Sequence, residues 1–176
     1  MGNRLDAYLD IETTGLSFLY NYITVIGIYL CENRSDRLVQ LVGEEVTRDN
    51  LMQSLEGVDT IYTYNGSRFD FPFVATHLEV NLNGRFRHHD LMYDCWEANL
   101  YGGLKAVERQ LEIPRQLQGI GGVEAITLWW RYQNYGDRDA LALLLQYNEE
   151  DVVNLKTLKG RLDGYTGPKT KWRYYE

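Results

Sequence analysis

The chain has 176 residues, a length that fits one domain. Hydrophobic residues make up 44% of it, which is enough for a core, and with only three prolines and no low-complexity segment it is not a disordered chain. The net charge of −7 argues against a protein that coats nucleic acid by charge alone. That argument weakens for a metal enzyme, because bound divalent cations cancel the charge of their acidic ligands.

The sequence gives only indirect indications of the cellular compartment. Cys31 and Cys95 lie far apart and form no CxxC pattern, so we expect reduced thiols in a cytoplasmic protein. Arg4 and Asp6 leave no apolar segment for a signal peptide. The longest clean apolar run, residues 141–145, is far too short to cross a membrane.

The N-terminal third is predicted to form strands. Apolar or alternating patterns mark four segments, at residues 6–12, 23–30, 38–42 and 60–64. The second segment is apolar almost throughout, which predicts an interior strand covered on both faces. Short connections between the first three predict an antiparallel meander.

The rest of the chain is predicted to be mainly helical. Helices are expected to begin near Thr47 or Asp49, at Phe71, at Leu104 and at Val123. The last of these is interrupted near Gly136-Asp137 and continues to Arg161. Residues 91–93 fit either a fifth strand or the start of a helix. This order predicts an α/β domain in which one mixed sheet carries helices on its faces.

Two acidic side chains lie at the end of the first predicted strand. Because side chains alternate along a strand, Ala7, Leu9 and Ile11 face one way, while Asp10 and Glu12 face the other. Two adjacent carboxylates repel each other unless a cation lies between them. Mg²⁺ and Mn²⁺ prefer such oxygen ligands. A solvated strand end explains the pair equally well, so the rest of the chain must supply the remaining ligands.

A third acid follows the fourth predicted strand. Asp70 lies five residues after Asn65, the first residue of the turn signal Asn65-Gly66. A helix is expected to begin at Asp70 or just after it. It is either another metal ligand or a helix cap, which is common at such positions.

The final predicted helix carries the most informative pattern. Positions three or four apart share one helix face, and here they are Leu144, Tyr147, Asp151, Leu155, Leu158 and Leu162. A carboxylate on a core-facing stripe is costly unless it is paired or binds a metal. A salt bridge to a buried arginine is the alternative for Asp151, although no partner lies on the stripe. Glu149 and Glu150 point elsewhere and are predicted to be solvated.

Taken in order, three motifs resemble those of the DEDD superfamily of 3′→5′ exonucleases: Asp10-Ile-Glu12-Thr, Asn65-Gly-x-x-Phe-Asp70 and Tyr147-x-x-x-Asp151. The tyrosine makes the chain similar to the DEDDy branch. The segments between the motifs resemble the YprB-like predicted exonucleases of the ribonuclease H-like fold. The resemblance extends to about Arg161.

The resemblance implies a ribonuclease H-like α/β fold, with a mixed five-stranded sheet of three antiparallel strands and then parallel strands, flanked by helices. This domain would occupy residues 1–163 and leave residues 164–176 as a basic and aromatic tail. Such a tail suits single-stranded nucleic acid, but a tail that packs on the domain or is disordered is the favoured interpretation.

The resemblance also implies roles at two divalent ions, Mg²⁺ or Mn²⁺. Asp10 would bridge both ions, Glu12 and Asp151 would hold the first, and Asp70 would hold the second through waters. Tyr147 would orient the attacking water by a hydrogen bond rather than by ionisation, because a free tyrosine titrates near pH ~10. Many of the small predicted exonucleases carry histidine there, so the tuning of this water stays open.

The resemblance further implies contacts with the end of a single DNA or RNA strand. They would come from the loop after the first motif and from the second motif, at Thr13, Thr14, Gly15, Leu16, Asn65 and Phe69. The implied activity is 3′→5′ hydrolysis that releases mononucleotides. Two alternatives stay open: a ribonuclease H-like module that binds nucleic acid without cutting it, and a phosphodiesterase of short oligonucleotides.

Overall fold

A computed structural model describes residues 5–32 and 35–167, so most of the tail predicted at residues 164–176 lies outside the described residues. The strands form one sheet in the order β3-β2-β1-β4-β5. Their bounds are β1 Leu5–Thr13, β2 Ile23–Cys31, β3 Asp36–Val42, β4 Val58–Thr63 and β5 Arg87–Asp90. Strand β1 is therefore the central strand of the sheet.

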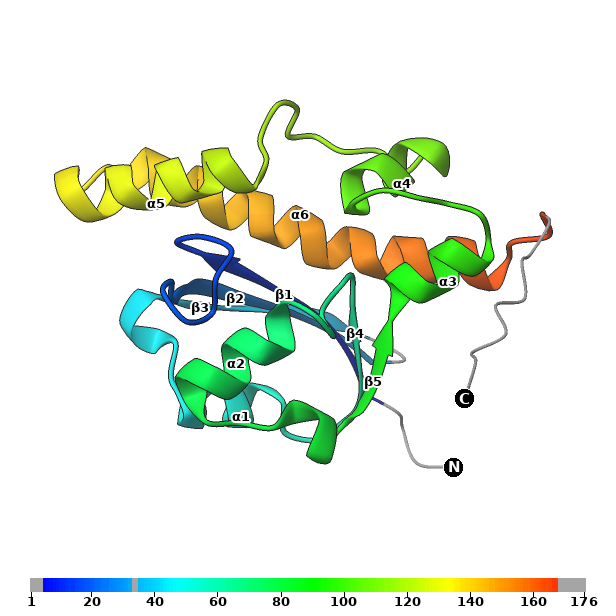
Figure 1. The fold of residues 1–176 in the computed structure, drawn as a ribbon, viewed down its shortest axis with the longest axis horizontal. Helices are drawn as coiled ribbons and strands as arrows, with labels where there is room; N and C mark the ends of the chain where they lie inside the picture. The colour runs from blue at the N-terminus through cyan, green and yellow to red at the C-terminus, as the bar shows by residue number, and fades with distance from the viewer. Residues whose placement is uncertain (1–4, 33–34, 168–176) are drawn as a thin grey trace.

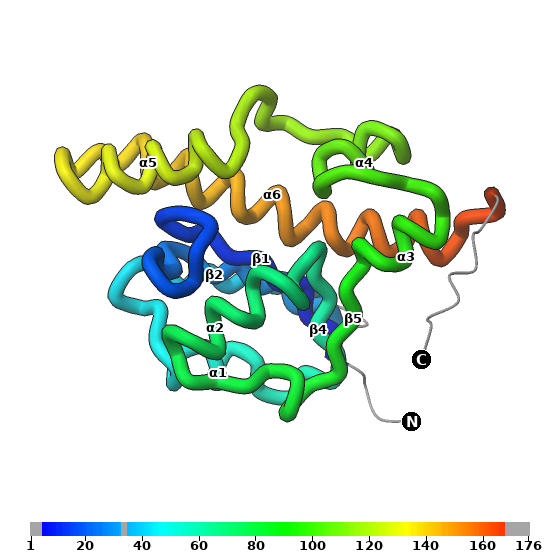
Figure 2. The backbone as a smooth tube through the Cα atoms, viewed as in Figure 1, coloured from blue at the N-terminus to red at the C-terminus, as the bar shows by residue number. Residues whose placement is uncertain are grey.

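Helices cover both faces of this sheet (Figures 1 and 2). Helices α1 and α2 lie on one face, and α3, α4, α5 and α6 lie on the other. The α-helices are α1 Arg48–Ser54, α2 Asp70–Leu78, α3 Leu91–Glu97, α4 Leu104–Gln110, α5 Gly122–Tyr135 and α6 Arg138–Asp163, with 3₁₀ turns η1 Gly43–Glu45 and η2 Leu82–Gly84. The long helix α6 runs across the sheet from one side to the other.

The strand directions confirm the predicted mixed sheet. Strands β1, β2 and β3 pair antiparallel, whereas β4 pairs parallel with β1 and β5 pairs parallel with β4. Parallel strands end at the same edge, so the residues after β4 arrive beside the end of β1. This arrangement places the second predicted motif next to the first.

The open question at residues 91–93 is resolved as a helix. Leu91 begins α3, and Asp90 caps it by accepting a hydrogen bond from the Met92 amide. The fifth strand is the preceding segment Arg87–Asp90, whose polar sequence gave no strand pattern. The predicted break near Gly136-Asp137 is confirmed, because Gly136 adopts φ 66° and the Asp137 side chain caps α6.

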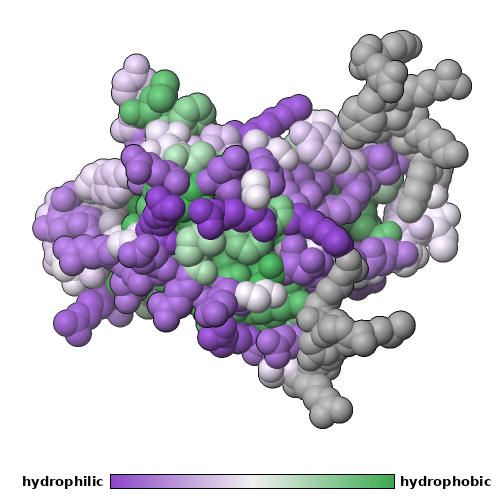
Figure 3. Space-filling model, turned by 90° about the horizontal axis from the view of Figure 1, so that it is seen from below, coloured by the Kyte–Doolittle hydropathy of each residue, from purple (hydrophilic) through white to green (hydrophobic). Residues whose placement is uncertain are grey.

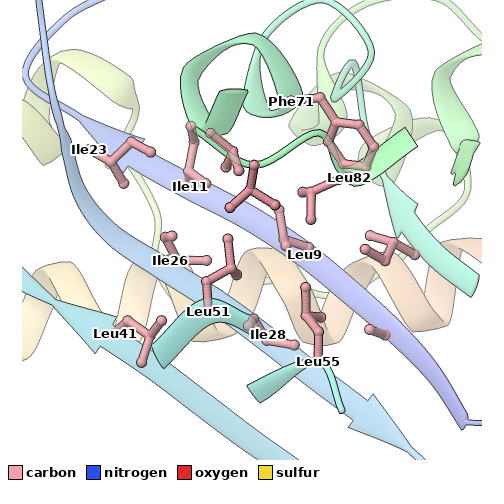
Figure 4. Packing of buried hydrophobic residues seen from close by; sticks show 14 of the residues in the cluster. Leu9, Ile11, Ile23, Ile26, Ile28, Leu41, Leu51, Leu55, Phe71 and Leu82 are labelled. Atoms are coloured by element: carbon pink, nitrogen blue, oxygen red, sulfur yellow. The ribbon is translucent and has the colours of Figure 1, made fainter. Parts of the chain in front are cut away.

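On the side of the sheet that carries α1 and α2, the core contains the apolar side chains that alternate along β1. Leu9 and Ile11 are buried there together with Ile26 and Ile28 of β2, and Leu51 of α1 lies over them (Figure 4). Burying one such side chain contributes about 1.5–3 kcal/mol. This cluster fixes which face of β1 points away from it, and so fixes where the acids go.

The opposite face packs against the predicted stripe of α6. Leu155, Leu158 and Leu162 form one cluster with Tyr8 of β1, while Leu144 and Tyr147 belong to a second cluster beside α5. Every member of the stripe is buried, as its spacing predicted.

The outer surface combines hydrophobic and polar regions. On the side that carries α1 and α2, hydrophobic residues collect in the middle and polar residues surround them (Figure 3). Among the described residues, no helix combines the length and apolar character that a membrane crossing needs.

A glycine allows α6 to approach the sheet closely at the centre. Gly27 of β2 lies opposite Asp10 in the register, and a Cβ built on it would lie 2.1 Å from Asn148 Oδ1. Asn148 of α6 is fully buried and donates its amide hydrogens toward Asp10. Glycine at position 27 therefore makes room for a contact between helix and sheet.

The mutation Gly27→Ala should destabilise the protein by about 1–3 kcal/mol, because the added methyl group displaces a buried and hydrogen-bonded amide. The matched control is Gly160→Ala in α6, where an added Cβ meets nothing within 4 Å. That change should stabilise the protein by about 0.5–1 kcal/mol through helix propensity. Urea denaturation measures both, and a G27A protein as stable as G160A would contradict the close approach.

Candidate active site

Strand β1 presents its two acids to helix α6. Glu12 is buried and Asp10 partly buried, on the strand face that also carries Tyr8. This is the orientation that the alternation predicted, and it rules out a freely solvated strand end.

Helix α6 brings Asp151 to the same place. One carboxylate oxygen each from Asp10, Glu12 and Asp151 lies within 4.8 Å of the other two. That spread is close to the span of oxygens around one Mg²⁺, whose ligands lie about 2.0–2.1 Å from the ion. Glu12 Oε1 is buried and has no hydrogen-bond partner among the described residues. The donor set, the spacing and this unpaired oxygen together fit a hard divalent cation.

Asp70 lies beside this cluster but outside the set of three. It is the first residue of α2, and its Oδ1 accepts a hydrogen bond of 3.1 Å from the amide of Ile11. Its side chain therefore ties the start of α2 to β1. Burial raises the pKa of the Asp70 carboxyl to about 7, against the pull of its backbone hydrogen bonds.

Burial and mutual repulsion disfavour ionisation of the cluster. Burial raises the pKa values of Asp10 and Glu12 well above their usual range, and the charge of Asp151 raises both further. Burial also raises the pKa of Asp151, to about 6, although Arg115 opposes the rise. A divalent cation among these oxygens would reverse the repulsion.

Asn148 is a site residue that the sequence reasoning missed. Its Nδ2 donates to the Asp10 backbone oxygen at 3.4 Å and to Asp10 Oδ2 at 3.3 Å, while its Oδ1 accepts from Gln40 Nε2 at 3.1 Å. The amide thus fixes the Asp10 carboxylate from the helix side. Asn148 lies four residues after Leu144 and three before Asp151, so its spacing could have added it to the stripe, but the stripe was drawn through Tyr147 instead.

Asp151 has the buried arginine partner that no residue on the stripe supplied. Arg115, from the segment between α4 and α5, donates from Nη2 to Asp151 Oδ1. The same guanidinium binds Glu108 with two bonds of 2.8 Å, and both side chains are almost completely buried. Arg115 lies 36 residues before Asp151, and no helical or strand spacing relates the two.

The ion pair does not exclude a metal role for Asp151. A carboxylate accepts several hydrogen bonds or ligand contacts, and the arginine uses one oxygen. Asn154 adds a bond of 3.0 Å to Glu108, so the network anchors the whole α4–α5 segment on α6. Burial lowers the pKa of Arg115, but the Glu108 bonds and the Asp151 charge outweigh it and raise that pKa overall.

The expectation that Glu150 is solvated was wrong. Its carboxylate accepts hydrogen bonds from the amides of Gln116 and Leu117, because α6 packs against the segment that leads to α5. Glu149 is exposed, as predicted.

Tyr147 lies in the same centre as the acids. Its ring is buried, and Lys105 Nζ lies 4.2 Å from the ring centroid. Burial raises the pKa of the tyrosine far above its usual value, and the charge of Asp151 adds to this. The phenol therefore stays protonated at neutral pH and keeps a hydrogen that it could donate.

Two hollows meet at the carboxylates. The first, here called the β1-loop hollow, has a volume of about 440 Å³ and is lined by Ile11, Thr13, Gly15, Leu16, Asn65, Phe69, Gly122, Val123 and Ile126 in addition to Asp10, Glu12, Tyr147 and Asp151. The second, the α4 hollow, has a volume of about 590 Å³ and shares Asp10, Asn65, Gly122, Tyr147 and Asp151. Its remaining walls come from Tyr64, Met92, Gly102–Ala106, Arg109 and Gly121.

Five of the six predicted substrate contacts line the β1-loop hollow. The exception is Thr14, whose hydroxyl accepts a hydrogen bond of 3.1 Å from the amide of Tyr22 and so helps to shape the loop. Leu16 is 85% exposed at the rim, while Phe69 packs against Phe73 with ring centroids 4.9 Å apart. These positions suit substrate contact, and that role stays a prediction.

Asp90 is a second missed residue, and it shapes the turn after β4. Its carboxylate accepts hydrogen bonds from the Asn65 amide at 2.7 Å and from the amide and hydroxyl of Ser67 at 3.0 and 2.7 Å. Asn65 adopts φ 62°, which asparagine tolerates better than most residues. The turn holds Asn65 where the two hollows meet.

Comparisons with known proteins agree with this fold. The family model described as the RNase_H superfamily matches residues 7–163. The uncharacterized protein YprB of Bacillus subtilis (strain 168) is 28% identical over 165 residues, which cover 86% of this chain and 40% of that protein. The chain thus spans well under half of the length of this curated relative.

Solved structures with the same fold include proteins that act on nucleic acid. The family B DNA polymerase from the hyperthermophilic archaeon Pyrobaculum calidifontis has a TM-score of 0.68 at 17% identity, over 90% of this chain and 24% of the polymerase. Brucella melitensis NrnC with bound Mg²⁺ has a TM-score of 0.60 at 16% identity, over 90% of this chain and 72% of NrnC. The same protein bound to pGG has a TM-score of 0.58 at 17% identity, over the same shares.

Without metal, the protein should lose stability as the pH rises from about 4.5 to about 7. The pKa values of Asp70 and Asp151 are raised to about 7 and about 6 in the fold, so the folded state holds protons that the unfolded chain releases near pH ~4. Melting temperatures measured in EDTA test this. Mn²⁺ should raise the melting temperature most at the upper end of the range, and Asp70→Asn should flatten the slope. A melting temperature in EDTA that climbs across this range would contradict the expectation.

Replacing Arg115 by methionine should destabilise the protein by about 3–5 kcal/mol, because Glu108 and Asp151 lose their shared buried counter-charge. The control is Arg131→Met, which removes a pair with Asp137 in which the arginine side chain is 54% exposed. That change should cost less than about 1 kcal/mol. Chemical denaturation of both variants measures the difference, and equal losses would show that the Arg115 network contributes no more than a surface pair.

Proposed function

This chain belongs to the RNase_H superfamily, and on that premise we propose that it is a metal-dependent 3′→5′ exonuclease acting on single-stranded nucleic acid. The observation that carries the proposal is the set of Asp10, Glu12 and Asp151 oxygens within 4.8 Å of one another. Glu12 Oε1 adds a buried acceptor that nothing among the described residues satisfies. A site built only for stability would not bring three carboxylates this close together with a single arginine bound to one of them.

We assign Asp10 to two divalent ions, Glu12 and Asp151 to the first and Asp70 to the second. When bound, such ions supply an activated water and stabilise the leaving oxygen of a phosphodiester. Mg²⁺ and Mn²⁺ both suit an all-carboxylate donor set. The structure of NrnC with bound Mg²⁺ shares this fold and supports the proposal.

The protein side chains keep the acids in place. Asn148 orients the Asp10 carboxylate, and Arg115 binds the Asp151 carboxylate. Tyr147 stays protonated and offers its hydroxyl hydrogen to the attacking water. This donor role requires no ionisation of the phenol, which the raised pKa of Tyr147 would prevent at neutral pH.

The β1-loop hollow would receive the terminal nucleoside. Leu16 and Phe69 offer apolar contacts for the base, and Asn65 offers polar groups at the junction with the α4 hollow. Apolar contacts of this kind do not read sequence, so the proposal names neither DNA nor RNA as the preferred strand.

The direct test is degradation of single- and double-stranded DNA and RNA, labelled at either end, with Mg²⁺ or Mn²⁺. Single strands should shorten from the 3′ end and release mononucleotides.

Asp151→Asn should lower the rate by more than about 100-fold, because it removes a ligand rather than an outer contact. Tyr147→Phe should lower it on the order of 10²-fold with the fold intact, because one positioned donor is lost.

Two results would overturn the assignment: no degradation of any strand, or full activity of Asp151→Asn. Calorimetric titration with Mn²⁺ then separates a non-cutting module from a nuclease, because a degenerate site binds the metal weakly.

A phosphodiesterase of short oligonucleotides is the remaining candidate, and NrnC bound to pGG, which shares the fold, favours it. Turnover of dinucleotides with longer strands left intact would identify that activity.

A further inference from the structure

The two hollows at the carboxylates differ in the charge of their walls. Among the described residues that line it, the β1-loop hollow has no lysine or arginine, and its outer wall is apolar at Leu16, Phe69, Val123 and Ile126. The α4 hollow is lined by two cationic side chains, Lys105 and Arg109. An anionic ligand that crosses the carboxylates is therefore attracted to one side and not to the other.

The two cations come from one face of one short helix. Lys105 and Arg109 are four residues apart in α4, so their Cβ atoms lie about 5–6 Å from each other on the same side. Val107 is buried on the opposite side of the helix, and Glu108 is buried in its pair with Arg115, so both fix the orientation of α4. The charged face is thus set by the packing of the helix and is directed at the hollow.

Lys105 lies at the inner end of this charged face. Its ammonium is 4.2 Å from the centroid of the Tyr147 ring and donates one hydrogen bond to the Ile120 carbonyl. An ammonium has three donors, so further donors are available to an anion in the hollow. Burial lowers the pKa of Lys105, while the charges of Asp151, Glu108 and Glu12 oppose the effect.

Arg109 lies at the outer end and is exposed. Within residues 5–32 and 35–167, no carboxylate forms an ion pair with it, in contrast to Arg115 six residues later. A guanidinium without a protein partner, at the mouth of a hollow that leads to an acidic centre, is free to bind a phosphate.

We propose that the α4 hollow binds the phosphodiester backbone of the strand that stays behind after cleavage. Lys105 contacts the phosphate nearest the scissile bond, and Arg109 contacts the next one. This inference rests on the proposed function and narrows its substrate class to strands of four or more nucleotides, the shortest that keep two phosphates when a 3′-terminal mononucleotide leaves. A dinucleotide with free ends carries only the scissile phosphate, so Arg109 has nothing to bind in it.

Arg109→Gln tests the inference, with Arg161→Gln as the matched control. Both arginines are exposed on helices, but Arg161 lines neither hollow. Arg109→Gln should raise the KM for a single-stranded pentanucleotide about tenfold and change the KM for a dinucleotide far less, because one charge-assisted contact is lost. The slope of log KM against log salt for the pentanucleotide should fall by about 0.7, the value for one phosphate contact on a single strand. Arg109→Lys should restore part of the affinity.

Binding measured without turnover keeps this test separate from that of the exonuclease. Fluorescence anisotropy with a labelled pentanucleotide and Ca²⁺ gives the affinity of each variant directly. Equal affinities and equal salt slopes for Arg109→Gln and Arg161→Gln would overturn the α4 hollow as a phosphate site, even if the enzyme degrades every strand. Weaker binding by Arg109→Gln alone would support it, even if no strand is cut.

Discussion

The repulsion among buried carboxylates is the constraint on which the rest of this structure depends. Asp10, Glu12 and Asp151 are brought within 4.8 Å of one another, and burial adds to the cost of their charges. The fold withstands that cost because β1 and α6 are each fixed by apolar clusters on both sides of the site. Such a centre is a ready receptor for divalent cations, whose charge removes the repulsion that the packing imposes.

Among the described residues, the positive charges beside the acids come from one part of the chain. Arg115 binds Asp151 and Glu108, while Lys105 lies over Tyr147, and both belong to α4 or to the segment that follows it. That part of the chain also forms a wall of the α4 hollow. Arg115 thus supports the acidic centre, while Lys105, ten residues earlier, shapes the hollow beside it.

Several features of the site were beyond the reach of pattern analysis. The partner of Asp151 is Arg115, from an irregular segment with no periodicity, and Glu150 is held by backbone amides of the same segment. Asn148 contacts Asp10 only because Gly27 lets the helix approach the sheet. Each of these contacts joins residues far apart in the sequence, where local spacing carries no information.

The elements that carry the acids, and the faces on which those acids lie, follow from local patterns in the sequence. Alternation placed Asp10 and Glu12 opposite the apolar side of β1, and a spacing of three and four residues placed Asp151 on the buried stripe of α6, because strand and helix periods are local properties of the backbone. How these faces meet, which cations accompany them and where the hollows open became visible only in the folded chain. Those outcomes depend on packing between distant segments, and packing is a property of shape rather than of period.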